Sequence, residues 1–254
     1  MSAFSHTTST LSRFCKATLD LLLPPRCIGT GEIVDAPGMV SPAYWSQLSF
    51  IEQPFCACCG LPFGFDATAD MLCGGCLEMA PEFDAARAAV VYNDASRQAV
   101  LDFKYGDRMH TAVTLASWMM RAGATLIDCC DILAPVPLHA RRLWQRRFNQ
   151  SAVLADIIAK RSGKIHLADA LHRRRHTVPQ KGLSRSERGQ NVKNAFGIDP
   201  RRAEIIKGKN ILLIDDVFTS GATLNECART LRHAGAAAVT VLTVARVTRE
   251  EFSF

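Results

Sequence analysis

The sequence has no long apolar run. Its purely aliphatic stretches are short, and residues 211–214 are a typical one. A membrane span is therefore not expected. Residues 1–10 are polar and the apolar group at 21–23 is too short for a secretory signal, so we expect a cytoplasmic protein. Aromatic residues make up only 7%, but 48% hydrophobic and 21% charged residues are typical of globular proteins and exclude a disordered or fibrous chain.

Ten cysteines in a chain without an export signal indicate metal ligands or free thiols before disulfides. Four of them form two C-x-x-C pairs, Cys56 with Cys59 and Cys73 with Cys76. Four thiolates in this pattern can surround a tetrahedral zinc ion at about 2.3 Å each, which predicts a structural zinc ribbon. The alternatives are a redox pair or unrelated buried thiols, and Cys58 is interpreted as a spare thiol.

A second set with similar spacing lies upstream and holds a single cysteine. Cys27 is followed by Thr30, and Ser41 is followed by Tyr44. These positions are either the remains of a lost metal site or unrelated to metal binding. One thiolate cannot hold zinc, so the interpretation of Cys27 as a small buried residue is preferred. The sequence therefore predicts one zinc per chain.

Positive charge is concentrated in one part of the chain. Residues 139–209 contain 18 basic and 5 acidic residues, a net charge of +13, whereas residues 1–138 carry −6 and residues 210–254 carry −1. Such a stretch favours an anionic partner.

The pattern along the chain predicts three parts: an amphipathic N-terminal helix in 1–25, a cysteine-rich zinc-ribbon module in 26–84, and an α/β domain in 85–254. The helix is expected to dock on the protein rather than on a membrane. The α/β domain should contain a largely parallel sheet flanked by helices. Its expected strands are 88–92, 131–135, 211–214 and 238–245, and its expected helices are 95–103, 109–125, 148–162 and 222–234.

The stretch after the apolar strand 211–214 predicts a phosphate site. Asp215 and Asp216 follow the strand, and a loop of small and hydroxyl residues leads into a helix. A helix start offers free N–H groups to a phosphate, and the loop lacks the lysine of an ordinary P-loop. Two adjacent carboxylates beside a phosphate suit a ligand with hydroxyl groups, such as ribose. The predicted phosphate-binding residues are Thr219, Ser220, Gly221, Ala222 and Thr223.

This run resembles the 5-phosphoribosyl-1-pyrophosphate (PRPP) motif of type I phosphoribosyltransferases. The resemblance implies a phosphoribosyltransferase fold in which Asp215 and Asp216, the candidate catalytic residues, bind the ribose hydroxyls while Thr219 to Thr223 hold the 5′-phosphate. Other segments resemble the ComF family, named for a competence protein needed for DNA uptake. These segments are 103–106, 131–139 with Arg141, Arg142, Arg146 and 148–150, and the later residues Arg173, Thr177, Gln180, Arg188, Asn191, Ala195 and Phe196.

The strand that ends near Pro135 supplies a second candidate loop. Val136, Pro137, Leu138 and His139 follow it, and the N–H groups of this loop would face a pyrophosphate held with Mg²⁺. Lys104 and Arg141 or Arg142 are expected to balance the charge of the diphosphate. Arg147 stands where the family usually has glycine, which restricts this loop.

The acceptor is not evident from the sequence, and two functions remain open. One is an enzyme that transfers phosphoribosyl from PRPP to an unidentified acceptor. The other is a non-catalytic, PRPP-responsive module that binds single-stranded DNA within the competence machinery, together with other competence proteins. The acid pair and loop favour PRPP binding in both, and the +13 stretch fits either PRPP or nucleic acid.

Overall fold

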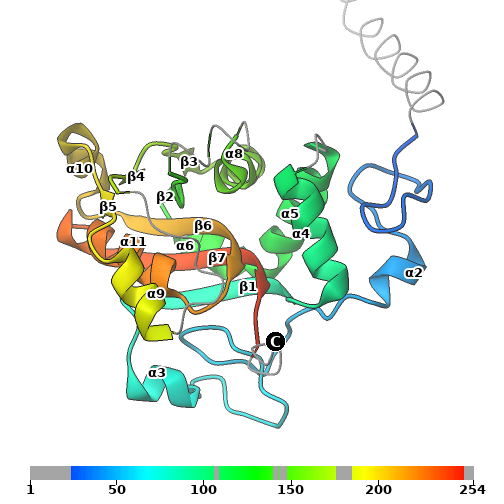
Figure 1. The fold of residues 1–254 in the computed structure, drawn as a ribbon, viewed down its shortest axis with the longest axis horizontal. Helices are drawn as coiled ribbons and strands as arrows, with labels where there is room; N and C mark the ends of the chain where they lie inside the picture. Colours follow the sequence, from blue (N-terminus) through cyan, green and yellow to red (C-terminus); the bar gives the residue numbers. More distant parts are fainter. Residues whose placement is uncertain (1–23, 106–108, 140–142, 144–147, 176–184, 249–254) are drawn as a thin grey trace, which may run out of the picture.

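The computed structural model describes residues 24–105, 109–139, 143, 148–175 and 185–248. Within these ranges the centre of the fold is a five-stranded, fully parallel sheet with the strand order β1-β7-β6-β2-β3 (Figure 1). The expectation of a largely parallel sheet is confirmed. The strands are β1 (Ala85–Val91), β2 (Ile132–Pro135), β3 (Ile165–His166), β6 (Asn210–Phe218) and β7 (Ala238–Arg246).

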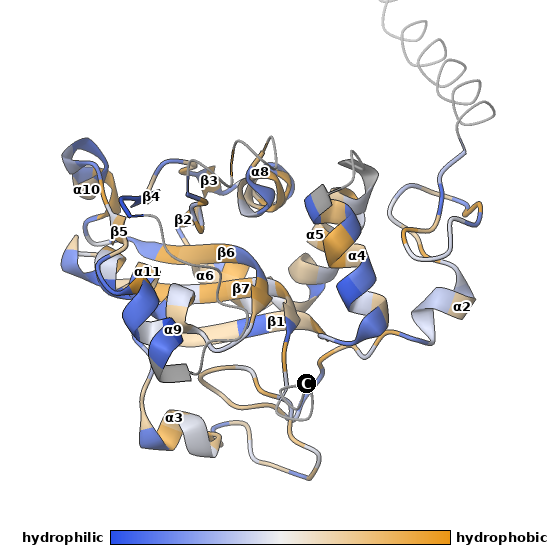
Figure 2. Cartoon of the chain, in the orientation of Figure 1, coloured by the Kyte–Doolittle hydropathy of each residue, from blue (hydrophilic) through white to orange (hydrophobic). Residues whose placement is uncertain are grey.

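The strand β6 lies in the middle of the sheet and is apolar over its first half, as Figure 2 shows. Its residues Ile211 to Ile214 are at most 1% exposed, because helices cover both faces of the sheet. The sequence predicts a strand over 211–214, but the strand continues to Phe218. The acid pair therefore lies inside β6, with Asp215 in register with Thr243 of β7.

Alternate residues of β6 enter two separate apolar cores. Leu212 and Ile214 pack with α4 (Asp94–Tyr105), α5 (Met109–Ala122), α6 (Ala124–Cys129) and α8 (Gln150–Ser162). Ile211 and Leu213 pack on the other face with α11 (Ala222–His233), α10 (Pro200–Ile206) and α9 (Arg185–Val192). The strand period of two residues thus divides the helices between the faces.

Two features of the α/β domain differ from the expected elements. The helix expected over 109–125 is broken at Gly123, where a Cβ would lie 2.6 Å from the Leu242 side chain. Glycine is also unfavourable inside a helix, and here it separates α5, which ends at Ala122, from α6, which begins at Ala124. The sequence also does not predict α9, α10, β3 or the antiparallel pair β4 (His172–Arg173) and β5 (Phe196–Gly197).

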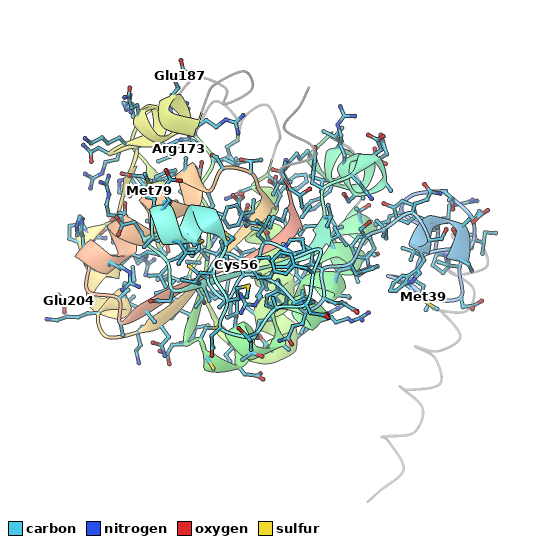
Figure 3. The ribbon with its side chains drawn as sticks, turned by 90° about the horizontal axis from the view of Figure 1, so that it is seen from below. Met39, Cys56, Met79, Arg173, Glu187 and Glu204 are labelled. Carbon is cyan, nitrogen blue, oxygen red and sulfur yellow. The ribbon has the colours of Figure 1, made fainter. Side chains whose placement is uncertain are left out.

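The cysteine-rich segment wraps around the outer edge of the sheet at β1. Ile51 donates its N–H to Ala89 (3.0 Å), and Ala86 donates to the carbonyl of Cys58 (2.6 Å). The part before this edge, with α2 (Pro42–Trp45), packs in the core of α4 and α5, whereas the part after it, with α3 (Gly74–Glu78), packs in the opposite core. Figure 3 shows Cys56 in the main body and Met39 in the outlying lobe.

The predicted N-terminal helix lies almost wholly outside the described residues, since the description begins at residue 24. Among the described residues, none of the helices has both the length and the hydropathy needed to cross a membrane.

Candidate functional site

The loop after β6 has the geometry of an anion site. Gly221 caps α11 with φ of 78°, a left-handed conformation that favours glycine, and a Cβ there would lie 2.8 Å from the Phe218 ring. The buried hydroxyl oxygen of Ser220 has no hydrogen-bond partner among the described residues. An unpaired buried hydroxyl is costly, so this group and the helix N–H groups suit a phosphate. The neighbouring Thr219, Ala222 and Thr223 are partly exposed.

The acid pair is held by three neighbouring groups. Ser151 donates its hydroxyl to Asp215 Oδ1 (3.0 Å), and the N–H of Asp216 donates to the same oxygen (2.9 Å). Lys104 Nζ lies 2.8 Å from Asp216 Oδ2. Burial, with the charge of Asp216 added, raises the pKa of Asp215 to about 7, so one carboxylate of the pair titrates near neutral pH.

The start of α8 connects three parts of the site. Asn149 caps this helix, accepting from the N–H of Ser151 (3.1 Å), and donates its side-chain amide to the carbonyl of Val136 (3.1 Å). Gln150 donates to the carbonyl of Lys104 (3.3 Å), and Ser151 reaches Asp215. Three consecutive side chains thus hold the candidate pyrophosphate loop, the end of α4 and the acid pair in one arrangement.

The candidate pyrophosphate loop leaves β2 beside β6. Val136 is buried and donates its N–H to the carbonyl of Ile214 (2.9 Å), so this N–H extends the sheet and does not face a ligand as the sequence predicts. Pro137, Leu138 and His139 follow and are partly exposed. Because β2 and β6 are parallel neighbours, both candidate loops leave the same edge of the sheet. Arg141 and Arg142 lie outside the described residues, so the structure places Lys104 but not these two cations at the site.

The four paired cysteines form a compact cluster at the apolar core that contains α9, α10 and α11. The sulfur atoms of Cys56, Cys59, Cys73 and Cys76 all lie within 4.8 Å of one another. The N–H groups of Cys73 and Cys59 point at the sulfur of Cys56, at 3.2 and 3.5 Å. N–H groups directed at a sulfur are typical of thiolate ligands, so the donor set and its geometry fit a tetrahedral zinc ion.

The upstream set is linked by hydrogen bonds. The hydroxyl oxygens of Thr30 and Ser41 lie 3.1 Å apart, and Tyr44 donates its own hydroxyl to the carbonyl of Ala95 (2.9 Å). Burial raises the pKa of Cys27, but hydrogen bonds from Thr30 and Ser41 outweigh burial and lower the pKa to about 7. The side-chain oxygens of Thr30 and Ser41 therefore meet each other, whereas the hydroxyl of Tyr44 is directed at α4.

Comparison with known proteins identifies the family. The chain is 33% identical over 197 residues to the DNA utilization protein YhgH of Salmonella typhi, covering 75% of this chain and 83% of that protein. It is 30% identical over 198 residues to competence protein F of Haemophilus influenzae, covering 76% and 85%. The chain belongs to the competence protein F family. Two domain families also match the chain. The family model of the double zinc ribbon domain matches residues 18–77, and that of the phosphoribosyl transferase domain matches residues 149–252.

The competence protein F assignment confirms the expected family and fold, a phosphoribosyltransferase-type α/β domain with an N-terminal zinc-ribbon module. The family model that matches this module is that of a double ribbon. It also supports a structural zinc site at the clustered cysteines. A solved structure with a similar chain is the glutamine PRPP amidotransferase of B. subtilis, with a TM-score of 0.35, 20% identity, and coverage of 56% of this chain and 30% of that chain. At this score the likeness adds nothing to the family assignment.

Two residues of the site are not evident from the sequence. Ser151 directly follows the predicted segment 148–150, but a serine in the first turn of a helix is common and gives no signal by itself. Arg246, the last residue of β7, is only 7% exposed and donates to Cys59. A lone arginine after an apolar strand is usually a surface residue, so only the fold identifies its position.

Proposed function

We propose that this chain binds PRPP with Mg²⁺ and transfers its phosphoribosyl group to an acceptor that remains to be identified. The observation that carries the proposal is the meeting of three elements at one sheet edge: the acid pair in β6, the Ser220 loop and the loop after β2. In this proposal Asp215 and Asp216 accept hydrogen bonds from the ribose hydroxyls. The loop from Thr219 to Thr223 holds the 5′-phosphate.

The proposed reaction is a displacement at the anomeric carbon of the ribose. The bond from this carbon to the pyrophosphate oxygen breaks, and pyrophosphate leaves with the electron pair. The nucleophilic atom of the acceptor forms the new bond and loses its proton. Mg²⁺ supplies charge neutralisation for the leaving group. The chain itself contributes mainly positioning and electrostatic stabilisation, with Val136 to His139 beside the leaving group and Lys104 as a nearby cation.

Calorimetry of PRPP with and without Mg²⁺ tests the binding step. The Asp215→Ala, Asp216→Ala double variant removes the acceptors for the ribose hydroxyls, so its affinity should fall by at least tenfold while the apolar half of β6 preserves folding. Asp156→Asn is a matched control. It breaks the ion pair between Asp156 and Lys160 on the exposed side of α8 (2.7 Å), which is similar in length to the pair between Lys104 and Asp216 (2.8 Å). A double variant that binds PRPP as tightly as the parent would refute the assignment.

Transfer is tested separately by following pyrophosphate release from Mg²⁺-PRPP in the presence of nucleobases, orotate or ammonia. Release that depends on one acceptor class, and is absent from the double variant, is the expected result. PRPP binding without release in any mixture would favour the non-catalytic alternative.

The second candidate is a PRPP-responsive module that binds single-stranded DNA during DNA uptake. The names of the relatives, competence protein F and DNA utilization protein, favour this process for the chain, as does the +13 stretch. We expect a logarithmic salt slope of about −0.7 per phosphate neutralised. Saturating PRPP should displace DNA if the sites overlap. An absence of DNA binding at low salt would exclude this candidate and leave the enzyme. Either function belongs in the cytoplasm, with other competence proteins as partners.

A further inference from the structure

Arg246 lies between the cysteine cluster and the strand that carries the acid pair. One guanidinium nitrogen donates to the carbonyl of Cys59 (2.7 Å), and another donates to the sulfur of the same residue (3.2 Å). The guanidinium carbon stands 4.0 Å from the centre of the Phe218 ring. A single buried side chain therefore contacts a zinc ligand on one side and the end of β6 on the other.

The group that faces the charge of Arg246 is the cysteine cluster. Among the described residues, both hydrogen bonds of the Arg246 side chain go to Cys59, and this side chain is in no ion pair with a carboxylate. Four thiolates around one Zn²⁺ carry a net charge of about −2. A buried guanidinium is strongly destabilising without an anion, so the thiolate cluster and Arg246 stabilise each other.

Phe218 transmits the position of Arg246 to the phosphate loop. Its ring is packed edge-on by Phe83 at 5.9 Å, and Gly221 approaches it so closely that a Cβ would lie 2.8 Å away. Its carbonyl accepts the N–H of Val247 (2.9 Å), the residue after Arg246. The turn of the loop is therefore built against a ring that Arg246 covers.

We propose that Arg246 is a positioning residue that couples the zinc cluster to the phosphate loop, so that metal binding orders the loop. The part of this proposal that concerns ligand affinity rests on the proposed binding of PRPP. The part that concerns zinc and loop order does not. Reciprocity requires that a ligand of the loop also stabilises the bound metal.

The test compares two arginine contacts between the sheet and the ribbon, that of the buried Arg246 and that of the partly buried Arg87. Arg246→Met removes the cation and keeps an apolar side chain against Phe218. Arg87→Met is the matched control, because Arg87 on β1 also donates to a ribbon carbonyl, that of Ala57 (3.0 Å), and covers a ring, that of Phe55 (4.4 Å). Within the described part of the chain, the Arg87 side chain donates only to the carbonyls of Ala57 and Ala86, and it makes no hydrogen bond to a ligand sulfur or to the phosphate loop.

The first measurement is zinc release from the full chain to a chromogenic chelator. Arg246→Met should accelerate release by about tenfold, within the usual range of coupling between sites, and Arg87→Met should change it less than threefold. The second is amide hydrogen exchange of residues 218–222, which should be faster in Arg246→Met and in the parent without zinc, and unchanged in Arg87→Met. Equal results for the two variants, or unchanged release and exchange in Arg246→Met, would overturn the proposal.

The third measurement adds Mg²⁺-PRPP, which should slow zinc release from the parent and not from Arg246→Met. A parent that does not bind PRPP would refute the proposed function alone, since release and exchange still decide the role of Arg246. A parent that binds PRPP without any change in zinc release would refute the coupling alone. If Arg246→Met does not fold, Arg246→Lys replaces it, because lysine keeps the charge but cannot bond the carbonyl and the sulfur while covering the ring.

Discussion

The hydrogen bond from Ser151 to Asp215 should set the pH at which the proposed PRPP site becomes competent. Ribose hydroxyls donate hydrogen bonds, so they bind best to an ionised carboxylate. Since burial and Asp216 raise the pKa of Asp215 to about 7, PRPP affinity should increase as the pH rises through 7 and level off above it. The Ser151 hydroxyl favours the ionised form, and Ser151→Ala should move this transition to higher pH.

The size of the shift follows from the contact. A hydrogen bond to a charged group contributes about 1.5 to 3 kcal/mol, and one pKa unit corresponds to about 1.4 kcal/mol. The N–H of Asp216 still donates to the same oxygen in the variant, so the lower end of this range applies. The transition should therefore move upward by about one pH unit. At pH 7 the ionised fraction falls from about one half to about one tenth, which weakens apparent affinity about fivefold.

Calorimetric titration of Mg²⁺-PRPP between pH 6 and 9 measures the effect. The phosphates of PRPP also titrate near pH 6, so the useful quantity is the ratio of variant to parent affinity, in which the ligand's own titration cancels. Ser162→Ala is the control, because Ser162 lies at the other end of α8 and donates to the carbonyl of Ile158 (2.7 Å). A Ser151→Ala profile with the same midpoint as the parent would refute this reasoning.

Three further predictions concern stability and metal content. Because the pKa of Asp215 is raised, the folded chain binds more protons than the unfolded chain between about pH 4 and 7. The free energy of unfolding, measured with denaturant at a series of pH values, should therefore fall as the pH rises through this window. Asp215→Asn should make this decrease smaller. Metal analysis should find one zinc per chain, lost in Cys73→Ser and retained in Cys27→Ser; two zincs in the parent would contradict this. Tyr44→Phe should cost about 1 kcal/mol of unfolding free energy, measured in urea, whereas Tyr44→Ala should cost about 3 to 5 kcal/mol, since the ring is buried against Gly29.

The sequence predicts the long elements of the α/β domain well because each has a strong period of its own. The apolar run 211–214 and the helical pattern over 222–234 correspond to β6 and α11 within a few residues. The short elements have no such period. The pair β4 and β5 consists of two residues each, and its pairing of Arg173 with Phe196 joins segments more than twenty residues apart. Tertiary contacts, rather than local preference, decide such strands.

The candidate site divides in a similar way. The residues that touch the proposed ligand lie in continuous motifs, so the acid pair and its loop can be predicted from the sequence. The residues that hold these motifs come from other elements. The sequence predicts Lys104 as a cation for the diphosphate, but only the fold brings its Nζ to 2.8 Å from Asp216. Likewise, the contact of Arg246 with Cys59 joins residues 187 positions apart.

The charge of the 139–209 stretch illustrates what composition alone cannot predict. Several of its arginines have structural partners in the described residues. Arg202 pairs with Asp169 (2.7 Å), and Arg175 donates to the carbonyls of Asn191 and Lys193 (3.0 Å each). A guanidinium that is already bonded can still attract an anion, but moving it toward a phosphate breaks a contact that the fold uses. The 18 basic residues of the stretch therefore overstate the number of cations that are available to DNA, and a measured salt slope much smaller than this number would give is the expected result.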